Sequence, residues 1–215
     1  MDQTADPSLL YFADPMCSWC WGFAPVIHRI RDAVQCPVQM FMGGLNPGHR
    51  TVMSAQQKEE IREHWQHVQN LTGRDFNFDF FLRDQFVYDT EPASRAVIAC
   101  FRMHDVQSLD FMTYLQQAFY AENQDISDPA LLVSLAQEFG LERDTFATLL
   151  DDAETAEITR LCFQYTRHLK INGFPTLIGQ ANGRHTIITR GYQPFEKIEA
   201  GIQTWLEQSV SGTSS

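Results

Sequence analysis

The sequence is short of positive charge and of long hydrophobic runs, and each shortage excludes a class of protein. Its 16 lysines and arginines stand against 27 acidic residues, which gives a net charge of −11 at pH 7. So acidic a chain lacks the basic surface with which proteins bind nucleic-acid phosphates. No stretch reaches the roughly 20 apolar residues that a membrane-spanning helix needs. We therefore expect neither nucleic acid nor membrane among its partners.

Cysteine is scarce as well. Only five of the 215 residues are cysteine, and this odd number argues against a full disulfide framework. A chain of this length can bury a hydrophobic core without cross-links. The N-terminal segment contains no apolar run long enough for a secretory signal peptide, so we expect a cytoplasmic protein. Cytoplasmic thiols are kept reduced, and a close cysteine pair there is more often catalytic or metal-binding than structural.

Two of the cysteines, Cys17 and Cys20, are separated by two residues in the segment DPMCSWCWG. The apolar run at residues 9–14 predicts a buried strand before them, and apolar residues at helical spacing predict a helix after them. A thiol at a helix N-terminus faces free backbone N–H groups and the positive end of the helix dipole, and both stabilise a thiolate. We therefore predict a redox pair, in which Cys17 attacks a disulfide and Cys20 resolves the mixed disulfide.

A zinc site and an inert core pair are the alternatives for these cysteines. Zinc needs four ligands, of which the pair supplies two, and the other three cysteines are isolated in apolar surroundings. His64 and His67 are three residues apart, but in EHWQH the glutamate precedes both, unlike the H-E-x-x-H zinc motif. We interpret the two histidines as a solvated helix face and expect no metal.

The remaining pattern predicts a sheet interrupted by helices. A second strand is expected at residues 36–45, and a hairpin at residues 173–179 and 185–191 that precedes a final helix. The stretch between the second strand and the hairpin has helical periodicity. One sheet interrupted by one helical insertion accounts for this order.

Within the helical stretch, several residues have predicted roles. Ser54 and Gln57 form a capping-box pattern at one helix start, and Ser127 is expected to cap another. A further helix is expected at residues 154–169, with Leu161 facing inward. The aromatic side chains of the segment FNFDFF are expected to fill the core of the insertion rather than to pave an interface.

Pro175, in the segment GFPT, begins the first strand of the hairpin and removes a backbone donor there. A cis Phe174–Pro175 bond would expose the Phe174 backbone to an extended peptide or to glutathione, and X–Pro is nearly the only bond that adopts cis at tolerable cost. A trans proline at the start of an edge strand fits the residues equally well.

The order of strand, CSWC, helix, strand, helical block, GFPT, hairpin and helix resembles the thioredoxin fold in its DsbA-like form. The segments FADPMCSWCWGF and GGL resemble the FrnE-like cytoplasmic branch of that family, and residues 89–97 resemble a segment that packs near its active site. The resemblance implies a cis Pro175. It also implies a thioredoxin-like domain at residues 8–48 and 170–208, with a helical insertion domain at residues 49–169.

The activity that the resemblance implies is thiol-disulfide oxidoreductase or disulfide isomerase. It would need no bound cofactor and would act on disulfides or thiols of proteins or small molecules, with glutathione as a candidate co-substrate or reductant. Two tryptophans beside the thiols either pack in the core or form an apolar lip for unfolded polypeptide. The expected site residues are Cys17 and Cys20 as the redox pair, and Phe174, Pro175, Trp19 and Trp21 for substrate binding.

The residues between the cysteines depart from the better-known relatives. Ser18 and Trp19 stand where the periplasmic oxidase DsbA has Pro-His. Without that histidine donor, we predict a centre less oxidising than the roughly −120 mV of DsbA. Kappa-class glutathione transferases and related isomerases share the fold, but carry serine in place of the first cysteine. A non-catalytic thioredoxin-like binding module is the other alternative.

Overall fold

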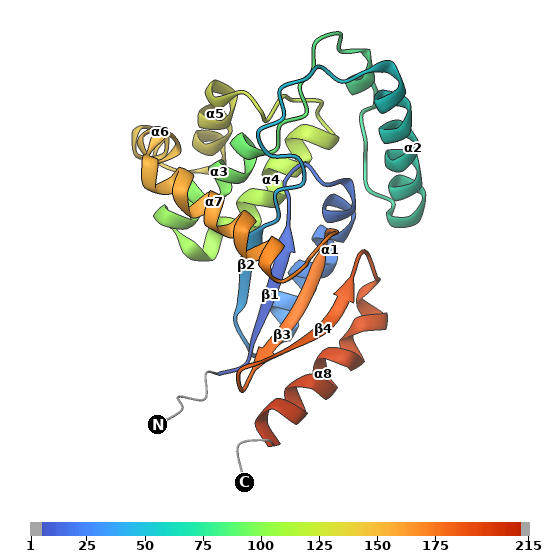
Figure 1. Cartoon of the computed structure of the whole chain (residues 1–215), viewed down its shortest axis with the longest axis vertical. Helices are drawn as coiled ribbons and strands as arrows, with labels where there is room; N and C mark the ends of the chain where they lie inside the picture. The colour runs from blue at the N-terminus through green and yellow to red at the C-terminus, as the bar shows by residue number, and fades with distance from the viewer. Residues whose placement is uncertain (1–5, 212–215) are drawn as a thin grey trace.

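The computed structural model describes residues 6–211 and contains one mixed four-stranded sheet (Figure 1). Its strands lie in the order β2-β1-β3-β4, with β1 parallel to β2 and antiparallel to β3, and with β3 and β4 as an antiparallel hairpin. Every residue of β1 is buried, as its apolar sequence requires. The strands are β1 (Ser8–Ala13), β2 (Val38–Met42), β3 (Thr176–Ala181) and β4 (Arg184–Arg190).

Helices cover both faces of the sheet, and six of them lie between β2 and β3 in the chain (Figure 1). The predicted α/β arrangement with a large helical insertion is therefore confirmed. No helix within residues 6–211 is both long and apolar enough to cross a membrane. The helices are α1 (Ser18–Ala33), α2 (Ala55–Thr72), α3 (Glu91–Met103), α4 (Ser108–Tyr120), α5 (Pro129–Phe139), α6 (Arg143–Asp151), α7 (Ala153–His168) and α8 (Phe195–Ser211), with 3₁₀ turns η1 (Phe78–Leu82) and η2 (Asp105–Gln107).

Alternate residues of β1 face different layers. Leu9 and Tyr11 belong to the large core that includes α1 and α8, whereas Leu10 and Phe12 pack with α7 residues on the opposite face. Side chains alternate across a strand, so this double burial follows from the position of β1 between two layers. The sheet core and the insertion share one hydrophobic cluster, and the domain boundaries at residues 48–49 and 169–170 stay a prediction.

The aromatic residues of the insertion fill its core, as predicted. The ring of Trp65 is almost fully buried, and its centroid lies 4.9 Å from that of Phe80 and 4.8 Å from that of Phe81. Tyr120 from α4 packs edge-on against the same indole at 4.9 Å. This cluster joins α2 to η1 and α4.

The helix ends confirm one cap and correct another. Ser54 and Gln57 form the predicted capping box of α2. The prediction of Ser127 as the cap of α5 is wrong: the N-cap is Asp128, whose carboxylate accepts a hydrogen bond from the Ala130 N–H at 2.9 Å. The Ser127 hydroxyl donates instead to Asp125.

Two further corrections concern the end of the insertion. Helix α6 was not predicted, because its N-cap is Glu142, and glutamate is not among the residues that usually occupy that position. Leu161 was expected to face inward but is 48% exposed. The buried stripe of α7 runs through Thr159 and Phe163 instead, so Leu161 lies on the opposite side of the helix.

A glycine in β3 makes the packing of α8 testable. A Cβ added to Gly179 would lie 2.2 Å from the indole of Trp205, whereas a Cβ on Gly201 in α8 would meet no atom within 4 Å. We expect Gly179→Ala to lower the free energy of unfolding by about 1–3 kcal/mol through overpacking. The control Gly201→Ala should raise it by about 0.5–1 kcal/mol, as for a glycine replaced within a helix. Urea unfolding of the two variants measures both, and equal stability of Gly179→Ala and the wild type would contradict the packing.

Candidate active site

The two cysteines lie at the N-terminus of α1, where the strand–CxxC–helix pattern placed them. Cys17 is the N-cap residue, and Cys20 lies in the first turn. Both are free thiols, and Cys17 keeps 6% of its surface exposed, whereas Cys20 is fully buried. A partner sulfur can therefore approach Cys17 but not Cys20, while the roles of attacking and resolving thiol stay a prediction.

The cysteine pair faces the loop before β3. The Cys17 thiol donates a hydrogen bond to the Phe174 carbonyl, with 3.6 Å between Sγ and O. The Phe174–Pro175 peptide bond is cis, as the family resemblance implied. Pro175 is held in turn by β4, because its carbonyl accepts a hydrogen bond from the Gly191 N–H at 2.7 Å. Residues 157 positions apart in the chain thus meet at one point.

Gly43, directly after β2, makes room for the ring of Phe174. A Cβ on Gly43 would lie 2.3 Å from that ring, so only glycine permits this contact. The Gly43 N–H also donates to the Ala13 carbonyl at 2.6 Å, which ties it to the end of β1. The GGL segment, quoted above for its family resemblance, therefore positions the proline loop through Gly43.

Burial dominates the electrostatics of Cys20. Removal from water, followed by the interaction with Cys17, raises the pKa of its thiol well above the ordinary value. Tyr11, on β1, is fully buried next to both cysteines, and burial raises the pKa of its hydroxyl as well. Neither group carries a charge at neutral pH while the site is closed and reduced, so the surroundings keep Cys20 a thiol.

A buried carboxyl group lies beside the pair. Asp14 follows β1 and is fully buried. Its two carboxylate oxygens accept hydrogen bonds from the Met16 N–H at 2.9 Å and the Leu45 N–H at 2.8 Å. Burial nevertheless outweighs these bonds and raises its pKa to about 6. The sequence analysis assigned no role to Asp14, although a charged residue directly after a buried strand was the available signal.

The insertion contributes the other wall of the site. The Tyr88 hydroxyl donates to the carbonyl of Met16, the residue before the redox pair. Thr90 accepts a hydrogen bond from the Asn46 N–H at 3.1 Å through its hydroxyl. Tyr88 thus contacts the CxxC loop, and the segment that begins at Asp89 is tied through Thr90 to the loop after β2.

The two tryptophans have different surroundings. Trp19 is partly exposed, and its ring centroid lies 5.4 Å from that of His67 and 6.2 Å from that of Tyr192. Trp21 is 2% exposed and lies between the ring of Tyr120 and the guanidinium group of Arg74. Trp21 is too deeply buried to contact a substrate at the surface. Trp19, in contrast, faces the surface beside Cys17.

A zinc site was one alternative interpretation of the cysteine pair. His64 and His67 are both exposed on α2, as predicted for a solvated face. Across residues 6–211, no group of three or more histidine, cysteine or acidic side chains is arranged to hold a metal ion.

A family profile assigns the fold. The profile of the DsbA-like thioredoxin domain matches residues 8–203. The chain belongs to the DsbA-like thioredoxin family. This confirms the resemblance drawn from CSWC, GFPT and the order of elements.

Solved structures of this family resemble the whole chain. A protein from Nitrosomonas europaea, provisionally assigned as a protein disulfide isomerase, is 35% identical, with a TM-score of 0.88 over 95% of this chain and 99% of that one. The cytosolic disulfide reductase DsbM from Pseudomonas aeruginosa is 27% identical, with a TM-score of 0.79 over 94% and 99% of the two chains. DsbM has also been solved with glutathione.

A curated relative is more distant. The ClpXP adapter protein SpxH from Halalkalibacterium halodurans is 22% identical over 173 residues, which make up 78% of this chain. This chain spans 56% of the length of that relative.

The buried carboxyl group gives this site a measurable pH dependence. Asp14 has a pKa of about 6 in the folded chain against 3.8 ordinarily, so the folded state favours its protonated form. Asp14 therefore costs no stability below about pH 4, and the stability falls by about 3 kcal/mol as the pH rises through 6. We expect the Asp14 carboxyl carbon to titrate near pH 6 by NMR.

Asp152 is an internal control in the same spectra. Its hydrogen bond with Arg102 lowers the pKa of its carboxyl group, so it should titrate below the ordinary range of an aspartate. Titration of both carboxyl groups near pH 4 would contradict the burial of Asp14.

Proposed function

We propose that this chain is a thiol-disulfide oxidoreductase that reduces or rearranges disulfides through Cys17 and Cys20. One observation carries the proposal: Cys17 occupies the N-cap position of α1 and its thiol donates a hydrogen bond to the Phe174 carbonyl before a cis proline, while Cys20 lies buried one turn further on. Family membership and the reductase and isomerase assignments of the similar structures support it.

The proposed reaction begins with attack by the Cys17 thiolate on a substrate disulfide. Backbone N–H groups at the start of α1 and the helix dipole stabilise this thiolate. One substrate sulfur leaves as a thiolate and takes a proton, and the other remains bonded to Cys17. The backbone of Phe174 and the exposed ring of Trp19 are suited to hold the substrate during this step.

The second step is attack by Cys20 on the mixed disulfide. Its sulfur bonds to that of Cys17, and the second substrate thiol is released. Because burial raises the pKa of Cys20, this thiol must lose its proton within the site. Asp14 interacts electrostatically with Cys20 and, with a pKa of about 6, is largely ionised at neutral pH. We propose that Asp14 promotes this deprotonation, directly or through water.

The cytoplasm stays the proposed location, since a reducing compartment suits a dithiol and the similar DsbM is described as cytosolic. Glutathione is the proposed thiol partner, because DsbM has been solved with it. We propose no bound cofactor. The chain keeps both thiols, which favours redox exchange over a transferase of the kappa-class type.

Substitution of single cysteines tests the two roles. Cys17→Ser should abolish the reduction of a disulfide-linked peptide, because the remaining thiol of the pair, Cys20, is fully buried. Cys20→Ser should accumulate a mixed disulfide between Cys17 and the peptide, visible as an adduct by mass spectrometry. Cys36→Ser is the matched control, as Cys36 is partly exposed and distant from the pair in sequence, and it should keep full activity. Adducts on Cys20 in the Cys17→Ser variant would contradict the assignment.

The role of Asp14 predicts a pH profile. In the wild type, the rate of mixed-disulfide resolution should rise with pH through about 6, as Asp14 ionises. Asp14→Asn should remove that inflection and slow resolution at pH 7 by about 10- to 100-fold, within the range of a lost acid–base group. Stopped-flow release of a fluorescent thiol measures the rate. An unchanged inflection in a folded variant would contradict the proposal.

The reduction potential of the cysteine pair determines whether the protein reduces or oxidises its substrates. Ser18 and Trp19 offer no charge to stabilise a thiolate, and burial opposes one at Cys20. We therefore expect a potential closer to the roughly −270 mV of thioredoxin than to the roughly −120 mV of DsbA. Equilibration in glutathione buffers, followed by tryptophan fluorescence, measures it. A value above about −200 mV would instead assign an oxidase or isomerase.

A further inference from the structure

Charge is unevenly distributed along this acidic chain. Residues 158–195 contain no aspartate or glutamate, although the chain has 27 in all. This acid-free stretch includes the cis-proline loop and both strands of the hairpin. Its basic residues are Arg160, Arg167, Lys170, Arg184 and Arg190. Residues 158–195 are thus the longest stretch of the sequence without a negatively charged side chain.

A pocket of about 310 Å³ opens at the cis-proline loop within this stretch. Its walls include Lys170, Phe174 and Arg190. The Phe174 carbonyl also accepts the hydrogen bond from the Cys17 thiol, so Phe174 links the pocket to the reactive sulfur. A volume near 300 Å³ is at the small end of ligand sites, which suits a small molecule better than a folded protein segment.

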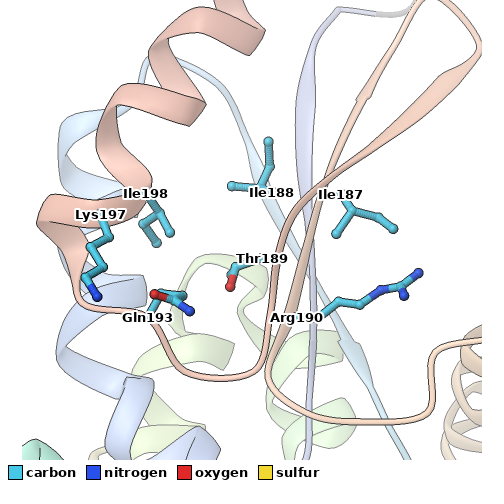
Figure 2. A pocket seen from close by; sticks show the side chains of 7 residues that line it. All are labelled: Ile187, Ile188, Thr189, Arg190, Gln193, Lys197 and Ile198. Carbon is cyan, nitrogen blue, oxygen red and sulfur yellow. The ribbon is translucent and has the colours of Figure 1, made fainter.

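A bulge in the hairpin turns Arg190 toward this pocket. Ile187 pairs with Ile178, and Arg190 pairs with Thr176, with a register shift between Leu177 and Ile178. Partners two residues apart on β3 face the same side, so Ile187 and Arg190 do too, although they are three residues apart. Figure 2 shows both on one side of β4, with Ile188 and Thr189 on the side of α8. Arg190 therefore leaves β4 on the side of Ile187, and it also lines a second pocket with Lys197 and Ile198 of α8.

The two cations of the pocket have no acidic partner within the described residues. Arg31, Arg95 and Arg102 are each held by carboxylates in ion pairs. Lys170 and Arg190 are exposed, and among residues 6–211 neither forms an ion pair or a side-chain hydrogen bond. Unpaired cations that line a pocket in a strongly acidic protein are suited to an anionic ligand.

We propose that Lys170 and Arg190 hold the carboxylates of glutathione while its sulfur reacts at Cys17. The sulfur of glutathione lies on its central residue and each end of the molecule carries a carboxylate, so a glutathione bonded to Cys17 can extend along Phe174 and present a carboxylate to the pocket. The proposal rests on the proposed function and adds the site that distinguishes glutathione from uncharged thiols. Lys170 and Arg190 are positioning residues here, because they contact the ligand away from its reacting sulfur.

The exchange balances with glutathione as the reductant. A glutathione thiolate attacks Cys17 of the oxidised pair, and the Cys17–Cys20 bond breaks, so that Cys20 leaves as a thiolate and takes a proton. A second glutathione thiolate attacks the glutathione sulfur of the mixed disulfide. Cys17 leaves as a thiolate, and glutathione disulfide is released. Two glutathione molecules lose two electrons in all, and the protein disulfide gains them.

The first test compares three thiols on the oxidised full-length chain at low salt. These are glutathione, its diethyl ester and 2-mercaptoethanol. We expect Lys170→Gln/Arg190→Gln to slow the reaction with glutathione by about five- to tenfold, the effect of two exposed charge pairs. Reactions with the ester and 2-mercaptoethanol should not change. The matched control Arg184→Gln replaces a cation of the same strand outside the pocket, and should leave all three rates unchanged.

The second test measures binding without redox chemistry. S-methylglutathione carries the same carboxylates but no thiol, so its calorimetric dissociation constant reports the pocket alone. We expect the double variant to bind it about five- to tenfold more weakly than the wild type or Arg184→Gln. Equal binding and equal glutathione rates would overturn the inference and leave the proposed function intact. Failure of the oxidised chain to react with any thiol, with binding still dependent on the two cations, would overturn the proposed function alone.

Discussion

The antiparallel pairing of β1 with β3 is the constraint on which the site depends. It sets Phe12 opposite Thr176, and so brings the loop after β1 to the loop before β3. Cys17 follows the first loop and Phe174 lies in the second, and the hydrogen bond between them closes the site. A slip of one residue in this register would turn the side chains of β1 to the wrong layers and part the thiol from the proline loop.

The different burial of the two thiols suits them to different steps of the proposed reaction. Cys17 lies at the helix end, where backbone N–H groups are free and a substrate can approach. Cys20 lies one turn inward, near Tyr11 and Asp14. Removal from water raises the pKa of all three side chains. The same desolvation that keeps Cys20 protonated brings Asp14 into a range where it can exchange protons near neutral pH. One physical cause therefore accounts for both properties.

The helical insertion completes a site that the sheet begins. Tyr88 bonds to the carbonyl of Met16, and Tyr120 stacks on Trp21 directly after the redox pair. The acid-free stretch and the bulge in β4 add a second property, since they surround the proline loop with unpaired cations in a protein of net charge −11. In the proposed arrangement, Cys17 reacts with the sulfur of the ligand, and the cations near the proline loop bind its carboxylates.

The sequence by itself determined the elements and the reactive pair. Periodicity and turn residues identify a strand, a helix and a hairpin from neighbours alone, and CSWC at a strand–helix junction identifies Cys17 and Cys20. Only the tertiary structure decided the rest. Trp21 is buried rather than exposed, burial raises the pKa of Asp14, and Arg190 lines the same pocket as Lys170. Burial and register depend on which distant segments meet, and local patterns carry no information about such contacts.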